Sequence, residues 1–473
     1  MKRLALILGA FTMLLVSLSN AQQRWERTYG GIYSDRGFSV RQTSDGGYIV
    51  AGVTGSFGAG GYDVYLIRTN ASGDTLWTKT YGGRSEDFGS SVQQTSDGGF
   101  IIAGATGSFG AGSYDVYLIK TSASGVARWT KFYGGSLEDW GYSVQQTSDG
   151  GYIVVGVKEI IVGSDKDVYF LKTDAFGDTL WTRTYGGTRE DYGFSVQQTT
   201  DGGYIVAGNT FSFGHSNGYP DVWLIKTNAA GDTLWTRTYG GTNFEYGYSV
   251  QQTSDGGYII VGNTESFGAG YGDIYLIKTN ASGDTLWTKT YGGINDDYGN
   301  SVQQTSDGGY IIAGGSCTFG QWGCDVYLVK TNASGNRIWT RTYSGTNWEV
   351  GNSVRQALDG GYIIAGCTNS FGAGDDDFYI IKTDSLGRSS GVEETAGVRG
   401  QGLGIRVTAK PNPFTSFATI PGHEAERFSL YDVSGRKVGT CRGDRVGEGL
   451  APGVYFLRSS DNKDKPLRIV KVR

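Results

Sequence analysis

A unit of 52 or 54 residues recurs seven times between residues 22 and 384, and this repetition restricts the fold more than any other feature of the chain. Its clearest marker is Asp-Gly-Gly followed by Tyr or Phe, which begins at Asp45, Asp97, Asp149, Asp201, Asp255, Asp307 and Asp359. A tryptophan keeps the same spacing, at Trp25, Trp77, Trp129, Trp181, Trp235, Trp287 and Trp339. Repeats of this length bury their apolar faces against their neighbours. Residues 22–384 are therefore predicted to form one repeat array.

Each unit contains four segments with the composition of β-strands. In one unit these are residues 91–95, 99–104, 116–121 and 128–133, which are rich in β-branched and aromatic side chains. Ser-Asp-Gly-Gly joins the first two segments as a tight hairpin, and no stretch shows the apolar period of an α-helix. Four-stranded units repeated radially are typical of a β-propeller, although a solenoid also stacks repeats.

The two ends of the array distinguish these architectures. The array begins with a lone fourth strand, residues 25–29, and its last third strand ends at Thr383 with no fourth strand after it. The strand missing at one end is thus present at the other. We therefore predict an all-β fold, a seven-bladed β-propeller over residues 22–384 in which the N-terminal strand completes blade seven.

The first 21 residues have the pattern of a secretory signal peptide. Lys2 and Arg3 precede an apolar stretch from residue 4 to residue 18, and Ser19-Asn20-Ala21 supplies the small residues expected at a cleavage site. The apolar stretch has about 15 residues, fewer than the ~20 that cross a bilayer, which disfavours an uncleaved anchor. No other stretch is long and apolar enough, so we expect an exported chain without a transmembrane span.

The last part of the chain differs from the repeat. Residues 385–404 are rich in Gly and Ser and are predicted to be a linker. Residues 401–473 carry 13 Lys and Arg against 7 Asp and Glu, a net charge of +6, whereas residues 22–400 carry 26 against 39, a net charge of −13. Six short strand-like segments follow the linker. We therefore predict a second domain at residues 405–473, a small β-sandwich.

Four ordered motifs give this second domain a family resemblance. Pro-Asn-Pro-Phe at 411–414 is followed by Leu-Tyr-Asp-Val-Ser-Gly at 430–435, by Pro-Gly-Val-Tyr at 452–455 and by the final Lys-Val-Arg. The segment closely resembles the type A C-terminal sorting domain of the type IX secretion system, with a shortened stretch between Ile420 and Phe428. The motif residues are Asn412, Pro413, Phe414, Gly435, Gly453 and Tyr455. The resemblance implies that the secretion machinery is a partner and that the protein ends outside the cell or on the outer-membrane surface.

The repeat itself resembles those of secreted bacterial β-propellers and is similar in layout to WD-repeat and quinoprotein-like propellers. It lacks the Trp-Asp ending of the WD repeat. It also lacks the Ser-x-Asp spacing of the sialidase box before its Gly-Asp-Thr-Leu-Trp segment. These resemblances therefore imply a fold and transfer no activity.

One acidic residue per unit stands two positions before a glycine, between the fourth strand of one unit and the first strand of the next. These residues are Asp35, Asp87, Asp139, Asp191, Glu245, Asp297 and Glu349. Because strand directions alternate, we expect all seven on one face, around the mouth of the channel. Two interpretations are open. Each carboxylate accepts backbone hydrogen bonds in its own turn, or the seven form a ring that binds a ligand or a cation such as calcium.

The loops between the second and third strands vary most and are the other candidate binding positions. His215 and Tyr219 stand out in the fourth of these loops, and Trp322 in the sixth, where Cys317 and Cys324 flank it at a spacing that permits one disulfide. The alternative interpretation is drift in tolerant loops. The Lys or Arg that closes each third strand is interpreted as a solvated guard of the sheet edge.

No motif for catalysis is recognisable in the repeat. With two histidines and four cysteines in the chain we expect no metal site, and the net charge of −13 disfavours nucleic acid as a partner. We therefore favour an exported, non-catalytic binding or scaffold module with a glycan or protein ligand on the loop face. Two alternatives stay open: a carbohydrate-active enzyme, which needs a placed pair of carboxylates, and a quinone-cofactor redox propeller.

Overall fold

The computed structural model describes residues 22–161, 165–215, 218–319, 323–390, 416–417, 419, 427–432, 436–442, 444–459 and 467–471. The predicted signal peptide, residues 1–21, lies outside these residues, and so do Trp322, Asn412, Pro413, Phe414 and Gly435. Over the described ranges the chain contains strands, turns and loops but no helix. A helix long and apolar enough to cross a membrane is accordingly not found in them. The chain divides into two compact units, residues 1–397 and 398–473.

In each repeat, the strand nearest the central channel is here called the inner strand. The inner strands are β2 (Asp35–Gln42), β6 (Asp87–Gln94), β10 (Asp139–Gln146), β14 (Asp191–Gln198), β18 (Glu245–Gln252), β22 (Asp297–Gln304) and β26 (Glu349–Gln356). The second strands are β3 (Tyr48–Thr54), β7 (Phe100–Thr106), β11 (Tyr152–Ile161), β15 (Tyr204–Thr210), β19 (Tyr258–Thr264), β23 (Tyr310–Ser316) and β27 (Tyr362–Thr368).

Two further strands complete each repeat toward the rim. The third strands are β4 (Asp63–Thr69), β8 (Asp115–Thr121), β12 (Asp165–Thr173), β16 (Asp221–Thr227), β20 (Asp273–Thr279), β24 (Asp325–Thr331) and β28 (Asp377–Thr383). The outer strands are β5 (Thr75–Tyr81), β9 (Ala127–Tyr133), β13 (Thr179–Tyr185), β17 (Thr233–Tyr239), β21 (Thr285–Tyr291), β25 (Arg337–Tyr343) and, from the N-terminus, β1 (Trp25–Tyr29).

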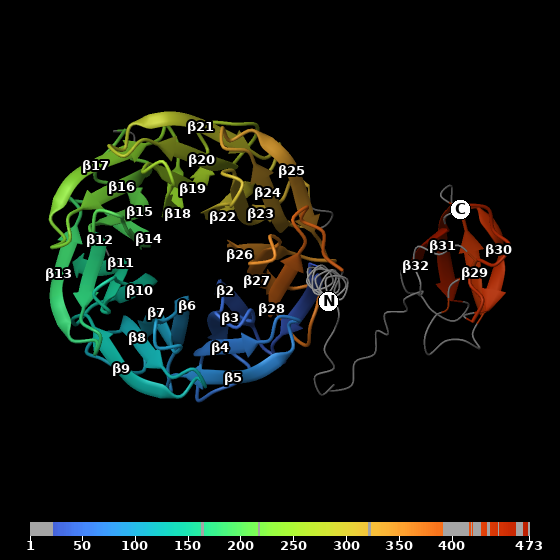
Figure 1. Ribbon diagram of the computed structural model, residues 1–473, viewed down its shortest axis with the longest axis horizontal. Helices are drawn as coiled ribbons and strands as arrows, with labels where there is room; N and C mark the ends of the chain where they lie inside the picture. The colour runs from blue at the N-terminus through green and yellow to red at the C-terminus, as the bar shows by residue number, and fades with distance from the viewer. Residues whose placement is uncertain are drawn as a thin grey trace, which may run out of the picture. The chain divides into compact units, whose positions relative to one another are not determined.

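The repeats fold into seven antiparallel four-stranded sheets, which surround a central channel (Figure 1). Six of them follow the chain, as in β2-β3-β4-β5, whereas the remaining one has the order β1-β28-β27-β26. In it Trp25 lies opposite Lys382 and Tyr29 opposite Phe378. The N-terminal strand therefore closes the ring, as the two ends of the repeat array predicted.

The turn after β28 belongs to the propeller. Asp384 and Arg388 close it through a backbone hydrogen bond of 2.9 Å, and the Tyr343 hydroxyl donates to the Gly387 carbonyl at 2.8 Å. The Ser385 backbone N–H donates to the Gln22 side chain at 2.9 Å. The repeat pattern thus continues through Arg388, a few residues past the predicted boundary at residue 384.

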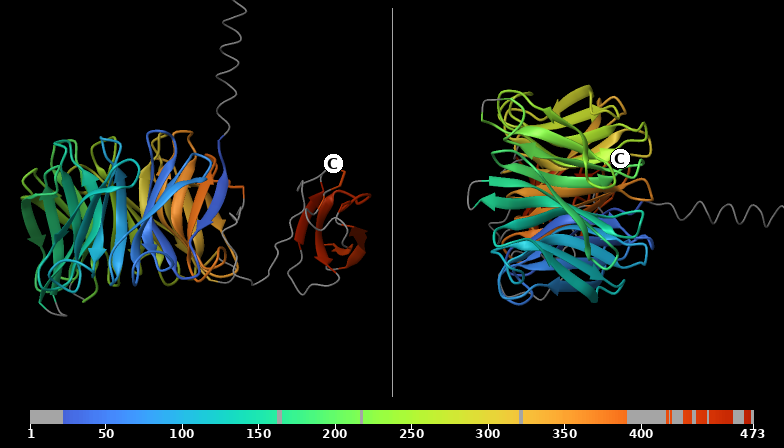
Figure 2. Two further views of the ribbon diagram at one scale, coloured as in Figure 1. Left: turned by 90° about the horizontal axis from the view of Figure 1, so that it is seen from below. Right: turned by 90° about the vertical axis from the view of Figure 1, so that its left-hand side faces the viewer.

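The connections between strands gather on two opposite faces of the ring (Figure 2). We call one of them the loop face; it carries the connections from outer to inner strands and from second to third strands. The opposite face carries the tight Asp-Gly-Gly turns and the turns between third and outer strands. Because the second-to-third loops are the longest and most varied, the loop face is where the scaffold differs most between blades.

The apolar core lies at the seams between neighbouring sheets. Trp77 of β5 packs edge-on against Phe100 of the next sheet, with ring centroids 5.9 Å apart, and an equivalent contact recurs at each seam. Gly125 of the following sheet presses on the Trp77 ring with a φ of +76°, where a Cβ would lie 2.8 Å from the ring. Only glycine fits this position without strain. The repeated tryptophans therefore pack between neighbouring blades.

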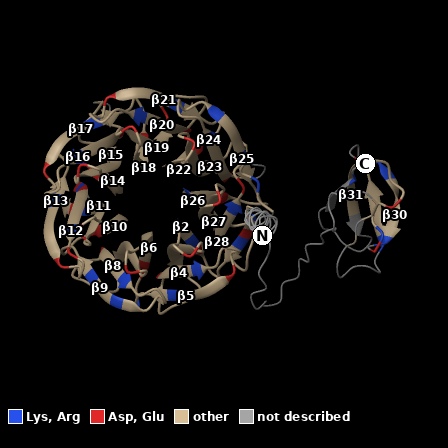
Figure 3. Ribbon diagram, viewed as in Figure 1, with Lys and Arg blue, Asp and Glu red and all other residues tan. Residues whose placement is uncertain are grey.

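The basic residue that closes each third strand is buried, so the prediction of a solvated edge guard was wrong. Lys120 is 4% exposed and its Nζ lies 2.9 Å from Asp97 Oδ2 in the Asp-Gly-Gly turn. The other pairs are Arg68–Asp45, Lys172–Asp149, Lys226–Asp201, Lys278–Asp255, Lys330–Asp307 and Lys382–Asp359. Basic and acidic residues recur around the whole ring (Figure 3). Burial raises the pKa of Asp97, but hydrogen bonds from Thr95 and Lys120 outweigh it and lower the pKa to about 2.

The described residues of the second unit form one four-stranded sheet of order β30-β29-β31-β32. Its strands are β29 (Arg427–Tyr431), β30 (Lys437–Arg442), β31 (Gly453–Ser459) and β32 (Leu467–Lys471). Phe428, Leu430, Val446 and Leu457 make its small core. A second sheet is not present among these residues, so the predicted sandwich is not confirmed.

Candidate functional site

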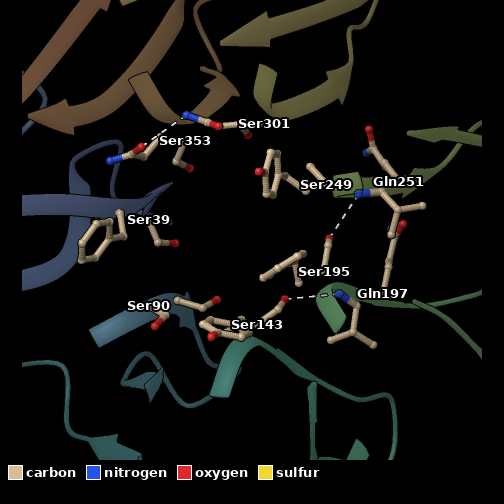
Figure 4. A pocket seen from close by; sticks show the side chains of 18 of the residues that line it. Ser39, Ser90, Ser143, Ser195, Gln197, Ser249, Gln251, Ser301 and Ser353 are labelled. Atoms are coloured by element: carbon tan, nitrogen blue, oxygen red, sulfur yellow. Dashed lines mark hydrogen bonds between the residues drawn. The ribbon is translucent and has the colours of Figure 1, made fainter. Parts of the chain in front are cut away.

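The inner strands surround a channel cavity of about 290 Å³ (Figure 4). Each inner strand has a β-bulge between its glycine and its serine, as between Gly37 and Ser39. A bulge re-aims the residue that it inserts, and β2 accordingly lines the channel with Phe38, Ser39 and Arg41. Among the described residues, no carboxylate and no histidine lines this cavity.

Seven serines, one from each inner strand, form a ring that we call the serine ring. Each Oγ accepts the backbone N–H of the valine in the next inner strand, at 3.1–3.3 Å. The members are Ser39, Ser91, Ser143, Ser195, Ser249, Ser301 and Ser353. Because Ser353 bonds Val40 across the seam closed by β1, the ring is continuous. It holds the inner strands in register and fixes the side chains on either side of it.

A continuous series of aromatic rings, which we call the aromatic arc, runs from the loop face into the channel. Neighbouring centroids are 4.5–6.3 Å apart. The arc consists of Tyr62, Phe88, Tyr114, Trp140, Tyr142, Tyr192, Phe194, Tyr219, Phe244, Tyr246 and Tyr248. Tyr219 is 42% exposed and the other rings are half-buried. The arc therefore offers partly exposed ring surface from blade one to blade five.

Tyr142 and Tyr248 of the arc keep their hydroxyl protons at neutral pH. Burial raises the pKa of Tyr142 to about 12, and the nearby Glu138 adds to this rise. Burial likewise raises the pKa of Tyr248 to about 12. Tyr114 donates its hydroxyl to Glu86 at 2.7 Å and Tyr192 donates to Glu190 at 3.1 Å. The arc therefore combines apolar ring faces with neutral hydroxyls and carboxylates.

The arc ends at a second cavity of about 330 Å³ on the loop face. Phe244, Tyr246, Glu265 and Asp296 line it together with the cysteines. Burial raises the pKa of Glu265, and the charge of Asp296 adds to that rise.

The seven predicted acidic residues stand at the first positions of the inner strands but are only 0–1% exposed. Each accepts the backbone N–H of a glycine four residues earlier at 2.7–2.9 Å, as Asp87 does from Gly83. Ser108 donates a further bond to Asp87 at 2.7 Å. This geometry matches the local interpretation, and none of the seven lines the channel. In the described part of the chain, no group of three or more His, Cys, Asp or Glu side chains is placed to hold a metal ion.

The other predicted positions do not converge on one site. The His215 side chain is 62% exposed, with Nδ1 3.3 Å from Asp221, whereas Tyr219 joins the arc through Phe244 at 4.5 Å. Cys317 and Cys324 are joined in a disulfide beside the second cavity. In the second unit, Gly453 and Tyr455 lie on β31, and Tyr455 donates its hydroxyl to Ala451 at 3.0 Å.

A buried carboxylate at the closing seam gives a prediction on pH. Asp377 of β28 is 1% exposed. Burial raises its pKa to about 7; the Ala373 backbone N–H opposes this rise, and the charge of Asp35 adds to it. A carboxyl whose pKa is raised on folding stabilises the fold below its unfolded pKa of 3.8, and this contribution is lost as the pH rises through about 7.

At about pH 8 we therefore expect the free energy of unfolding of Asp377→Asn to exceed that of the unmodified chain by an amount on the order of 3 kcal/mol. The variant should accordingly melt at a higher temperature. At about pH 4 the difference should largely disappear. Thermal unfolding across this range measures it, with Asp375→Asn, an exposed neighbour, as the matched control. Parallel pH profiles for both variants and the unmodified chain would contradict the account.

Sequence reasoning finds only part of the aromatic arc, because an aromatic residue directly follows the repeated acid at Phe88, Trp140, Tyr192 and Tyr246. It missed the continuity of the arc, the serine ring and the two arginines of the channel. The arc joins loop residues to strand residues from different repeats, so no local pattern displays the whole of it. The serine was visible as a repeated residue, but its partner lies 53 or 55 residues away in the next repeat, or 313 residues away across the closing seam. The signal that could have found the arginines is their departure from the repeated glutamine.

No protein-family model matches this chain. The regulatory protein FlaEY of Caulobacter vibrioides is 24% identical over 248 residues, which is 48% of this chain and 22% of the length of FlaEY. Two β-propellers are similar among solved structures. PorZ, an essential surface component of the type IX secretion system of Porphyromonas gingivalis, is 12% identical over 94% of this chain and 60% of its own, with a TM-score of 0.42. YCF48 bound to a D1 peptide is 8% identical over 77% of this chain and 98% of its own, with a TM-score of 0.44. At these values the similarity concerns the fold alone.

Proposed function

We propose that this protein is an exported binding module and that the aromatic arc holds its ligand, a glycan. The continuity of the arc carries the proposal. Packing alone does not require these rings, because the channel positions of Tyr142, Phe194 and Tyr248 are taken by Ser90 and Asn300 in other inner strands. The same bulged scaffold thus accepts small polar residues. The rings are concentrated on one side of the channel, where a ligand would meet all of them.

A glycan suits the chemistry of the arc. Ring faces pack against the apolar C–H surfaces of a sugar, and the tyrosine hydroxyls and the carboxylates of Glu86 and Glu190 exchange hydrogen bonds with its hydroxyl groups. The protein surface here is preformed, because each inner strand is bonded to the next through the serine ring. Preorganisation lowers the entropic cost of binding.

A second candidate function is favoured by one observation. Glu265 and Asp296 line the cavity at the end of the arc, and the pKa of Glu265 is raised by burial and by the charge of Asp296. A carboxyl group with a raised pKa beside a second carboxylate is an arrangement that a glycan hydrolase uses as acid and base. A carbohydrate-active enzyme is therefore the alternative to a non-catalytic module.

Export is the second part of the proposal. The pattern of residues 1–21 supports transport by a signal peptide, and the resemblance of residues 405–473 to a type A sorting domain supports delivery through the type IX secretion machinery. The mature chain would then act outside the cell or on the outer-membrane surface. The charge contrast between the two parts, +6 against −13, is consistent with a separate delivery domain.

Screening the chain from residue 22 onward on a glycan array tests the binding proposal. We expect a restricted set of glycans to bind. An array without any bound glycan would contradict the proposal, and a protein ligand would then be the remaining class. A panel of glycosidase substrates run beside it, with Glu265→Gln as control, separates the alternatives: turnover that this variant loses would identify an enzyme.

A further inference from the structure

Arg41 and Arg355 interrupt an otherwise uniform set of glutamines in the channel. The equivalent residues of the other inner strands are Gln93, Gln145, Gln197, Gln251 and Gln303. Each of these glutamines accepts, through Oε1, the backbone N–H of a glutamine in the next inner strand at 2.6–2.7 Å. A guanidinium has no acceptor atom, so this inter-blade bond cannot form from β2 or β26.

The arginines also lack a carboxylate partner. They lie on neighbouring inner strands and line the same cavity, whose described lining holds no Asp or Glu. Arg41 donates to the Val40 carbonyl at 3.2 Å; Arg355 donates to the Val354 carbonyl at 2.6 Å and to Ser301 Oγ at 3.3 Å. A guanidinium has five N–H donors, so most of them remain available to the channel.

Two adjacent cations in a narrow channel are unfavourable for the folded state on their own. Burial lowers the pKa of Arg41 to about 10. Burial also lowers the pKa of Arg355 well below its usual value, and the charge of Arg41 adds to this effect. Together with the two lost inter-blade bonds, this makes the unliganded arrangement costly, and an anion would offset the part of the cost that comes from the two positive charges.

We propose that Arg41 and Arg355 bind an oxyanion, the carboxylate or phosphate group of a small molecule, inside the channel. Paired guanidinium groups match such oxygens with charge-assisted hydrogen bonds. The cavity of about 290 Å³ has room for a molecule larger than the anionic group itself. Tyr142, Phe194 and Tyr248 line the same cavity from other blades and would meet the rest of the ligand. These three rings also belong to the aromatic arc, whereas the arginines, which carry this proposal, do not.

The experiment compares anion binding by the unmodified chain and by R41Q/R355Q, which restores the glutamine of the repeat. Inorganic phosphate and acetate are titrated separately, against chloride at matched ionic strength, with thermal unfolding and calorimetry as readouts. We expect the melting temperature of the unmodified chain to rise with the concentration of at least one of them. In the double variant, Kd should be weaker by about tenfold or more.

A second expected result distinguishes a ligand site from a structural one. Without either oxyanion, R41Q/R355Q should melt at a higher temperature than the unmodified chain. The variant regains two inter-blade hydrogen bonds and loses the repulsion between the two guanidinium groups. Lys131→Gln, on the outer strand β9, should keep the full anion response. A response to phosphate alone or to acetate alone identifies the anionic group. The proposal would be overturned if the double variant responded to the anions as strongly as the unmodified chain, or if the unmodified chain responded to neither anion. If the double variant does not fold, the single variants R41Q and R355Q replace it in the same measurements.

Discussion

Deletion of residues 22–31 is expected to abolish the cooperative folding of the propeller. The deletion removes β1, whose Trp25 and Tyr29 are 4% and 8% exposed, and leaves β28 with an unpaired edge. Loss of a large buried aromatic side chain costs roughly 3–5 kcal/mol, so the two together approach the total stability of a typical domain. We expect the melting temperature to fall by roughly 15 °C or more, if a transition remains at all.

A circular permutant is the matched control for this deletion. It carries residues 23–31 after Arg388 instead of at the N-terminus, which gives the same number of residues between Lys382 and Trp25 as between Arg68 and Trp77, so the same strand pairs with β28 while the chain order changes. Because the Asp384–Arg388 turn already has the geometry of the turns that lead into the other outer strands, the permutant should melt close to the unmodified chain. An unchanged melting temperature in the deletion variant would show that β1 does not close the ring.

Removal of residues 405–473 is expected to block delivery without unfolding the propeller. The chain divides into compact units at residues 397 and 398, and the propeller cores consist of residues from the first unit alone. In a bacterium that has a type IX secretion system, we expect the truncated protein in the periplasm and the full chain at the cell surface or in the medium. Cell fractionation with immunoblotting measures the distribution.

The melting temperature of the truncated protein serves as the control for this experiment. If it equals that of the propeller transition in the full chain, retention in the periplasm cannot be attributed to misfolding. Tyr455→Ala, at a motif residue whose hydroxyl bonds Ala451, tests the same assignment with a single change. Delivery of the truncated protein at normal levels would contradict the sorting assignment.

The architecture was predictable because each repeat carries its own markers. The spacing of the Asp-Gly-Gly turns identified the strands, and the spare strand around Trp25 identified the closure. The burial of the Lys and Arg residues that end the third strands was not predictable, since the sequence does not show that Lys120 points at the Asp97 turn rather than at water. The ion pair links the end of β8 to the Asp-Gly-Gly turn of the same sheet, 23 residues earlier in the chain.

The candidate site was less predictable than the fold. Its carboxylates were recognised from the repeat, and the structure shows them engaged in turns such as that of Asp87. The functional candidates lie where the repeats differ from one another: rings at Tyr142 and Phe194 where another blade has Ser90, and Arg41 where glutamine is the rule. A departure in one repeat looks like drift until the fold places several departures side by side.

The most direct test of the account is a calorimetric titration of the strongest glycan from the array with Phe194→Ala and Phe176→Ala. Phe194 belongs to the aromatic arc, whereas Phe176 is a 72% exposed ring in a turn between a third and an outer strand. The account predicts that Phe194→Ala weakens binding by about tenfold, or ~1.4 kcal/mol, with Phe176→Ala unchanged. Equal affinity of both variants and the unmodified chain would show that the ligand binds elsewhere and would contradict the central claim.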